Sequence, residues 1–373
     1  MAAELHSDLI RLANEFGADE TYSRAGGGNA SVKHGGVLHI KPSGVPLATL
    51  GDADLVPLRI DVLLKALDSD APVEGDPVRA AAQAAQIGDT AGRRPSVEIL
   101  FHASIPDALV LHLHPLVANA ITCNVRGREL TKELLGDQAV WVDYIDPGVP
   151  LARGVAAARR EHEARTGQPA PAITLLGNHG IIVSGASYDD VTARTRWLTA
   201  TVQAAIDATQ APTAFGESRD VGWIASAFRD AVGGAAVAWS RGDEDIVRTS
   251  SGTAAGPVSG GPLTPDQIVY AGSLPLVLEA ADSNERIAQR IADFRATHGR
   301  PPLVAVIPSV AVIAAGDSDK AAQNALATYL DALRVARDAD RIGTVRVMSP
   351  SERHFIEHWE AEAYRKSVAA SGG

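Results

Sequence analysis

The sequence contains a single cysteine, no long apolar run and no excess of positive charge. The lone thiol, Cys123, excludes an intramolecular disulfide and a cysteine-rich metal site. No apolar run approaches the ~20 residues that a membrane-spanning helix requires, and charges interrupt the N-terminal stretch where a signal peptide would be apolar. These absences predict a cytoplasmic protein without a membrane partner.

The charge balance limits the partners further. The chain has 34 Lys and Arg against 45 Asp and Glu, a formal net charge of −11. Proteins that coat nucleic acid do so with clustered Lys and Arg, so this balance argues against a nucleic-acid partner. With 46% apolar and 21% charged residues, a chain of 373 residues can bury a core and is long enough for two domains.

The first part of the chain is typical of a layered α/β domain, which we predict over residues 1–215. An amphipathic helix opens it, because Leu5, Leu9, Leu12 and Phe16 fall on one stripe. Further elements are expected as strands over 37–40 and 109–114, a strand pair within 173–183 and a helix over 188–208.

The rest of the chain, residues 216–373, predicts a second and smaller α/β domain. The stretch 251–262 is rich in Gly, Ser and Ala and is expected to be a loop or linker. A strand is expected at 268–270, and the alternation of elements beyond it favours a largely parallel sheet.

Three histidines form the most informative pattern. His112 and His114 share one face of a predicted strand whose leucines point to the other, and their Cα atoms would lie about 6.6–6.8 Å apart. That spacing lets two imidazoles converge on one ion, and His179, at a Gly-flanked corner between apolar strands, offers a third. Three imidazoles leave the open coordination position that a catalytic zinc ion requires.

Other interpretations of the histidines stay open on pattern alone, because a strand histidine is often a hydrogen-bonded core or surface residue. The histidines without a supporting pattern are interpreted as structural or solvated, and they are His6, His34, His39, His162, His298, His354 and His358.

Glu98 opens a predicted helix upstream of His112. A carboxylate near a metal can act as a general acid or base. The alternative is a first-turn glutamate that the helix dipole favours, and position alone favours this alternative. His102, one turn further on, is expected to pack in the core.

Two glycine-containing stretches resemble backbone nests that present N–H groups to an anion. One is Gly26-Gly27-Gly28-Asn29, and the other is Lys41-Pro42-Ser43-Gly44, in which Lys41 adds positive charge. Neither matches the P-loop spacing, and no G-x-G-x-x-G lies between a strand and a helix, so dinucleotide binding has no support.

Taken together and in this order, these stretches resemble the class II aldolase/adducin family over roughly residues 5–210. The resemblance implies a three-layer α/β/α domain with zinc, or another divalent metal, on His112, His114 and His179. It places the family's acid/base carboxylate on Glu98, and a tyrosine that assists proton transfer near Tyr144. The implied phosphate-binding positions are Gly28, Asn29, Ser43, Gly44 and Ser96.

The C-terminal part, about 218–373, resembles the segment that follows the aldolase domain in long rhamnulose-1-phosphate aldolase/dehydrogenase fusions. The stretches 263–266 and 355–359 carry this resemblance, and the sequence does not contain the short-chain dehydrogenase domain that ends those fusions. Simpler family members have Thr and Ser hydroxyls where this chain has Gly26 and Val97, whereas the fusions share its Gly-rich loop.

The resemblance implies reversible retro-aldol cleavage of a keto sugar, such as a rhamnulose- or fuculose-phosphate-like compound. Glu98 would shuttle the proton at the nucleophilic carbon, and Tyr144 or water would serve the other fragment. A sugar-phosphate 4-epimerase, a dehydratase or a decarboxylase would share the scaffold. An adducin-like interaction module, which needs no metal, is the alternative of another class. The family also implies a homo-oligomer, typically a tetramer.

Overall fold

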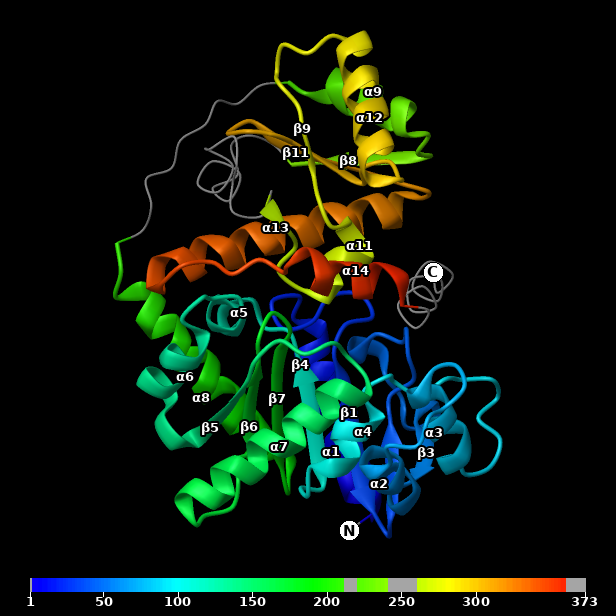
Figure 1. Cartoon of the computed structure of the whole chain (residues 1–373), viewed down its shortest axis with the longest axis vertical. Helices are drawn as coiled ribbons and strands as arrows, with labels where there is room; N and C mark the ends of the chain where they lie inside the picture. The colour runs from blue at the N-terminus through cyan, green and yellow to red at the C-terminus, as the bar shows by residue number, and fades with distance from the viewer. Residues whose placement is uncertain (1, 211–219, 241–259, 360–373) are drawn as a thin grey trace. The chain divides into compact units, whose positions relative to one another are not determined.

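The computed structural model describes residues 2–210, 220–240 and 260–359 (Figure 1). They form two compact units. The first contains the chain up to Thr122 together with Arg126–Ala205, and the second contains Cys123–Val125 and the described residues from Ile206 onward. The predicted boundary at residue 215, and most of the predicted linker at 251–262, lie outside the described residues.

The first unit is built on a seven-stranded mixed sheet. Its strands in spatial order are β3 (Val56–Arg59), β2 (Val37–Ile40), β1 (Asn29–His34), β4 (Leu109–Leu113), β7 (Gly180–Gly185), β6 (Ile173–Leu176) and β5 (Ala139–Val142). Neighbouring strands are antiparallel except for the parallel pair β5–β6. The strands predicted at 37–40 and 109–114, and the pair within 173–183, are confirmed.

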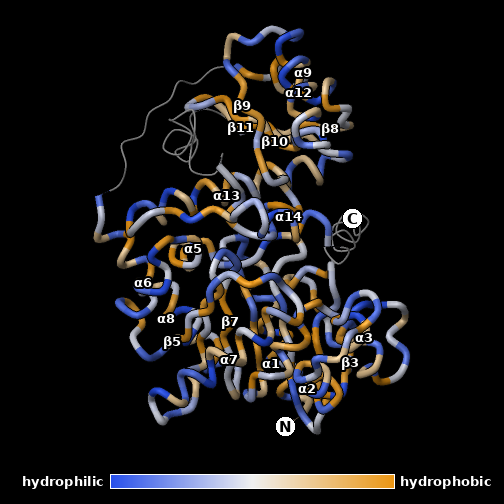
Figure 2. The backbone as a smooth tube through the Cα atoms, viewed as in Figure 1, coloured by the Kyte–Doolittle hydropathy of each residue, from blue (hydrophilic) through white to orange (hydrophobic). Residues whose placement is uncertain are grey.

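Helices cover both faces of this sheet, as the predicted three-layer arrangement requires. One face packs against α2 (Ile60–Asp68), α3 (Pro77–Ala85), α4 (Ile99–Ser104) and α7 (Val149–Thr166). The other face packs against α1 (Ala2–Ala18), which contacts β1 and β4, while α8 (Tyr188–Asp207) is bonded to α1 through Tyr188 and Glu15. A strand covered on both faces is apolar along its length, and β7 is buried throughout and mostly hydrophobic (Figure 2).

The remaining elements of the first unit are short or peripheral. They are η1 (Leu47–Thr49), η2 (Asp52–Asp54), α5 (Leu116–Thr122), α6 (Gly127–Leu135) and η3 (Gly136–Gln138).

The second unit has a four-stranded sheet in the order β8 (Ala236–Trp239), β11 (Ala311–Gly316), β10 (Val304–Ile307) and β9 (Leu276–Val277). Its helices are α9 (Gly222–Val232), α11 (Pro265–Ala271), α12 (Asn284–His298), α13 (Asp319–Ile342) and α14 (Pro350–His358). A second α/β region is therefore present at the C-terminal end of the chain.

Two predictions about the second unit are wrong. Its sheet is mainly antiparallel, because β10 and β11 form a hairpin and β11 pairs antiparallel with β8, leaving only β9–β10 parallel. The hairpin turn contains Ser309 at φ +58°. Non-glycine residues seldom adopt this conformation, so a serine at this position does not predict a tight turn from the sequence. The strand expected at 268–270 is part of α11, whose start is fixed by Thr264, since its side chain accepts a hydrogen bond from Gln267 N.

Candidate active site

Three imidazoles meet at the end of β4. The candidate ligand atoms of His112, His114 and His179 all lie within 4.8 Å of one another, so these side chains could hold a metal ion. The Nε2 atoms of His112 and His114 are 3.0 Å apart. The ring of His179 lies 5.0 Å from that of His112 and 5.2 Å from that of His114. Residues that are far apart in the sequence are thus brought to one point.

His112 is oriented by the neighbouring strand. It is completely buried, and its Nδ1 donates a hydrogen bond of 2.8 Å to the carbonyl of Ile181 on β7. Such a bond fixes the tautomer and turns the Nε2 lone pair toward the other imidazoles. The leucines of this strand are buried in the core, as expected, and the face that carries His112 is buried as well, where its ring meets Phe101 edge-on.

His179 is held by the tight corner between β6 and β7. Asn178 has φ +49° and donates its N–H to Thr122 O at 2.7 Å, and His179 N donates to Leu176 O at 3.1 Å. A Cβ on Gly180 would lie 2.6 Å from His114 Cδ2 and would also meet the Leu113 carbonyl. Only glycine lets the two strands approach closely enough to bring His114 and His179 together.

Glu98 faces the histidines from the start of α4. Its Oε1 lies 3.4 Å from Nε2 of both His112 and His179, and its side chain is only 5% exposed. It is the N-cap residue of α4, but its side chain makes no capping hydrogen bond. The carboxylate is therefore directed at the imidazoles and does not cap the helix, and its predicted acid/base role stays a prediction.

The Gly-rich loop brings Asn29 to the same place. Gly28 has φ +70°, and a Cβ there would lie 2.8 Å from His112 O and 2.9 Å from Leu47 Cδ1. Asn29 then begins β1 directly opposite His112, and its amide nitrogen donates to Glu98 Oε2.

The second predicted anion-binding stretch pairs with the segment before α4. Ser43 N donates to Arg94 O at 2.8 Å, and Ser96 N donates to Lys41 O at 3.2 Å. Ser96 Oγ in turn accepts a bond from Glu98 N, which ties this stretch to the histidine cluster. Gly44, at φ +84°, lies in the turn that follows.

The side chain of Lys41 points inward. It is 1% exposed, and its ammonium donates to Val45 O at 2.7 Å and to Pro42 O at 3.3 Å. This geometry shows a lysine that holds its own loop together. Its predicted contribution to anion binding stays a prediction.

Tyr144 follows β5, and its hydroxyl donates to Asp146 Oδ1 at 3.2 Å. Its backbone passes the corner that carries His179, since a Cβ on Gly177 would lie 2.9 Å from Tyr144 N. The predicted role of the tyrosine in proton transfer stays a prediction.

His102 lies in the core beneath the cluster, as expected. Its ring stacks on Phe101, its Nδ1 is 2.7 Å from Ser31 Oγ, and complete burial lowers its pKa well below the ordinary value. His102 is therefore a neutral core residue at neutral pH.

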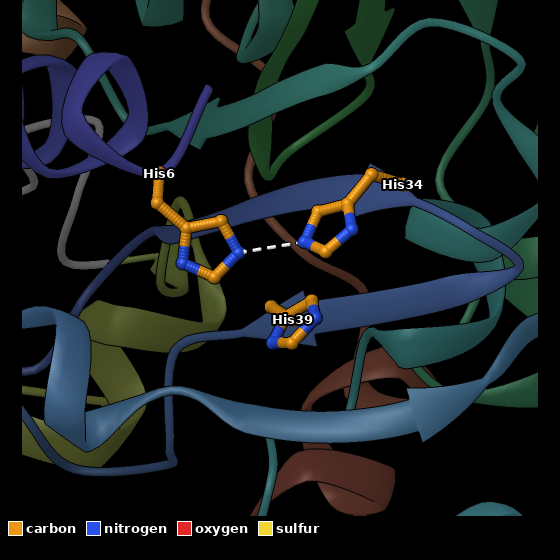
Figure 3. Close-up of side chains that lie close together, drawn as sticks. All are labelled: His6, His34 and His39. Carbon is orange, nitrogen blue, oxygen red and sulfur yellow. Dashed lines mark hydrogen bonds between the residues drawn. The ribbon is translucent and has the colours of Figure 1, made fainter. Parts of the chain in front are cut away.

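A second group of histidines was not predicted from the sequence. His6, His34 and His39, interpreted above as structural or solvated, come together on the sheet face that α1 covers (Figure 3). A usable signal was present, since His34 directly precedes the Gly35-Gly36 pair that closes the β1–β2 hairpin and His39 lies three residues after that pair.

Comparison with known proteins identifies a family for the first part of the chain. A family model described as the class II aldolase and adducin N-terminal domain matches residues 7–206. The uncharacterized oxidoreductase YuxG of Bacillus subtilis (strain 168) is 24% identical over 409 residues, which cover 97% of this chain and 58% of that protein. The chain thus spans less than two thirds of the length of this curated relative.

Solved structures similar to this chain cover about half of it. The N-terminal class II aldolase domain of a conserved protein from Thermoplasma acidophilum has 24% identity and a TM-score of 0.46, over 53% of this chain and 92% of that one. L-fuculose-1-phosphate aldolase from Thermus thermophilus has 22% identity and a TM-score of 0.35, over 54% and 94%. Among the described residues, no helix has the length and apolar character needed to cross a membrane.

Proposed function

The chain belongs to the class II aldolase and adducin family, and we propose that it is a zinc-dependent aldolase that reversibly cleaves a keto sugar. One observation carries the proposal: a buried carboxylate oxygen, Glu98 Oε1, lies 3.4 Å from the Nε2 atoms of two histidines of a three-imidazole cluster. A buried carboxylate beside three imidazoles is the arrangement that acid/base chemistry at a metal requires, whereas binding another protein does not require it.

The donor set fits zinc. His112, His114 and His179 would hold the ion, because three imidazoles leave a coordination position for substrate. The Ile181 carbonyl behind His112 is the kind of outer partner that orients a metal-binding imidazole. When bound, zinc supplies Lewis-acid polarisation of the carbonyl group and stabilises the negative charge that develops on the substrate oxygens.

The chain's own residues would move the protons. In the cleavage direction the C4 hydroxyl loses its proton to Tyr144 or to water, and the C3–C4 bond breaks. Glu98 then delivers a proton to the carbon of the ketone fragment, and the reverse steps apply in synthesis. Asn29 holds Glu98 Oε2, so that Oε1 stays on the side of the histidines.

We propose a ketose 1-phosphate as substrate. The phosphate would lie between the Gly28–Asn29 turn and the segment that contains Ser43, Gly44 and Ser96. This proposal rests on the pairing of Lys41 with Ser96 and on the bond from Glu98 N to Ser96 Oγ, which bring the second stretch to the catalytic carboxylate. The oligomeric state implied by the resemblance stays a prediction.

The test is a screen of zinc-loaded protein with aldehyde release as the readout. Ketose 1-phosphates, the matching unphosphorylated ketoses and 2-keto acids form the three arms. The proposal expects aldehyde from the phosphorylated ketoses. Accumulation of a C4 epimer without aldehyde would identify a 4-epimerase, and carbon dioxide from the keto acids a decarboxylase.

Variants then test the site. Glu98→Gln should retain the zinc ion of the candidate active site and lose aldehyde release, while His114→Gln should lose aldehyde release together with that zinc ion. The matched control is Glu129→Gln, because Glu129 is an exposed first-turn glutamate of α6 and should change neither quantity. An active Glu98→Gln variant would contradict the acid/base role. Purified protein without metal, and unable to take it up, would instead favour the interaction module.

A further inference from the structure

The second histidine cluster lies on the opposite face of the sheet from the candidate active site. In the β1–β2 hairpin, His34 pairs with Val37 and Val32 pairs with His39. Directly opposed residues share a face, so the His34 and His39 side chains project to the same side. Asn29, an odd number of residues from His34 on the same strand, projects to the other side. Any ion held here is separate from one held by His112.

His6 joins this pair from the first turns of α1. The core-facing stripe of α1 contains Leu9, Ala13 and Phe16, and His6 extends it by one turn toward the N-terminus. Its ring lies 5.0 Å from that of His34 and 4.6 Å from that of His39. The Nε2 atoms of His6 and His34 are 2.9 Å apart (Figure 3).

Asp52 forms a hydrogen bond with the His6 ring nitrogen that does not face His34. Its Oδ1 accepts a hydrogen bond from His6 Nδ1, which places the proton of the neutral ring on Nδ1. The Nε2 lone pair is then directed toward His34. A carboxylate that fixes the tautomer of a ligand histidine in this way is the usual outer partner in metal sites.

We propose that His6, His34 and His39 form a second site for a transition-metal ion of the zinc class, with Asp52 as the outer carboxylate. Their candidate ligand atoms all lie within 4.8 Å of one another. Two nitrogens bound to one tetrahedral zinc ion at about 2.0–2.1 Å lie roughly 3.3 Å apart, so the observed 2.9 Å needs only a small outward shift. Imidazole ligands select zinc, copper or nickel over magnesium or calcium.

The surroundings of the cluster leave room for an ion. The cluster lines an open cavity of about 740 Å³, whose wall includes Ser7 and Arg11, so an ion can enter and keep a water molecule in its remaining position.

The bound ion would cross-link α1 to the β1–β2 hairpin. β1 begins at Asn29, which holds Glu98, so the hairpin anchors one wall of the candidate active site. The site is structural in this proposal, since its ligands do not face the substrate region.

A third group, His354, Glu357 and His358 on α14, is a weaker candidate. Glu357 is already ion-paired with Arg300 and Arg353. Their positive charges oppose a cation, whereas the outer partner of the His6 group is a carboxylate.

The experiment measures zinc bound per chain after equilibrium dialysis of the metal-stripped protein. The His34→Gln/His39→Gln double variant should bind about one zinc ion fewer than the parent. The control His298→Gln, an exposed histidine outside these clusters, should bind as many as the parent. Equal binding by the double variant and the parent would overturn the proposal.

A second measurement separates this site from the candidate active site. In a His112→Asn/His114→Asn background, zinc at a hundredfold excess over its Kd should still raise the melting temperature by about 5 °C or more. Adding His6→Gln to that background should abolish the rise. His6 lies near the start of α1 and is not one of the buried residues of that helix. The proposal would be contradicted if zinc still raised the melting temperature after His6→Gln was added, or if it did not raise it in the His112→Asn/His114→Asn background. Either result is independent of whether the protein is an aldolase.

Discussion

Asn29 and His112 lie directly opposite each other on β1 and β4, and both reach the carboxylate of Glu98. The amide of Asn29 binds Oε2, while Oε1 is 3.4 Å from His112 Nε2. Because opposed residues of an antiparallel pair project to one face, the strand register itself brings an amide and an imidazole to the same side chain. The Gly-rich loop therefore serves the acid/base group as well as any bound anion.

Replacing Asn29 should impair chemistry more than metal binding. Asn29→Ala frees Glu98 Oε2 from its donor, so the carboxylate loses its fixed orientation. We expect kcat to fall by about 10–100-fold, as for other outer partners of metal sites, with bound zinc unchanged. The control is Asn14→Ala, which removes an amide bonded to the carbonyls of Leu47 and Leu50 away from the cluster. Steady-state kinetics and metal analysis of both variants check this, and unchanged kcat in Asn29→Ala would contradict it.

Gly28 is required for its contacts as well as for its backbone angle. In Gly28→Ala the new methyl group would meet His112 O and Leu47 Cδ1, besides straining a residue at φ +70°. Gly88 has the same φ but nothing within 4 Å of an added Cβ, so Gly88→Ala measures the angle alone, about 1–2 kcal/mol. Urea unfolding should show a larger loss of stability for Gly28→Ala. Equal losses would mean that the close approach to β4 is unimportant.

The candidate active site could be predicted because its parts follow from short-range rules. Strand alternation alone puts His112 and His114 on one face. The Gly-flanked corner at His179 marks a tight turn in any fold. The direction of Glu98 could not be predicted, because a helix N-terminus favours a glutamate whether its side chain caps the helix or faces away.

The second histidine group was missed because no single element contains it. The Gly35-Gly36 pair does predict a two-residue hairpin, from which the shared face of His34 and His39 follows. The arrival of His6 depends on how α1 crosses the sheet, and that is set by tertiary packing of its apolar stripe. The prediction of a parallel sheet in the second unit was wrong for a similar reason. The β10–β11 turn has Ser309 at positive φ, where a glycine would have indicated a hairpin in the sequence.

Replacing Lys41 tests whether its ammonium group stabilises its own loop or binds the anionic group of the substrate. Lys41→Met removes the donor to the carbonyls of Val45 and Pro42. Leaving a buried acceptor unpaired costs about 1–3 kcal/mol, so we expect a loss of that order in the free energy of unfolding. A direct role in anion binding would appear as a raised KM for a phosphorylated ketose, with KM for the unphosphorylated ketose unchanged. Ser43→Ala is the comparison, because it removes a hydroxyl from the same stretch and keeps the lysine.

Lys33 should make stability depend on pH above neutrality. Burial lowers its pKa from 10.5 to about 7, against the opposing effect of Asp107, and its ammonium donates to His102 O. Between pH 7 and about 10.5 the unfolded chain therefore binds a proton that the folded chain does not. Stability consequently rises with pH across this window, by at most about 1.4 kcal/mol per pH unit, and the destabilising effect of the charged lysine is greatest below pH 7.

Lys33→Met removes that proton from both states. The difference in free energy of unfolding between the parent and Lys33→Met should therefore increase in favour of the parent as the pH is raised from 7.5 to 9.5, measured by urea unfolding at fixed ionic strength. Lys65→Met, which removes an exposed lysine ion-paired with Asp61, is the control for a lost charge. A difference that stays constant across this range would mean that Lys33 remains protonated in the folded protein, because the effect of the Asp107 carboxylate on its pKa outweighs the effect of burial.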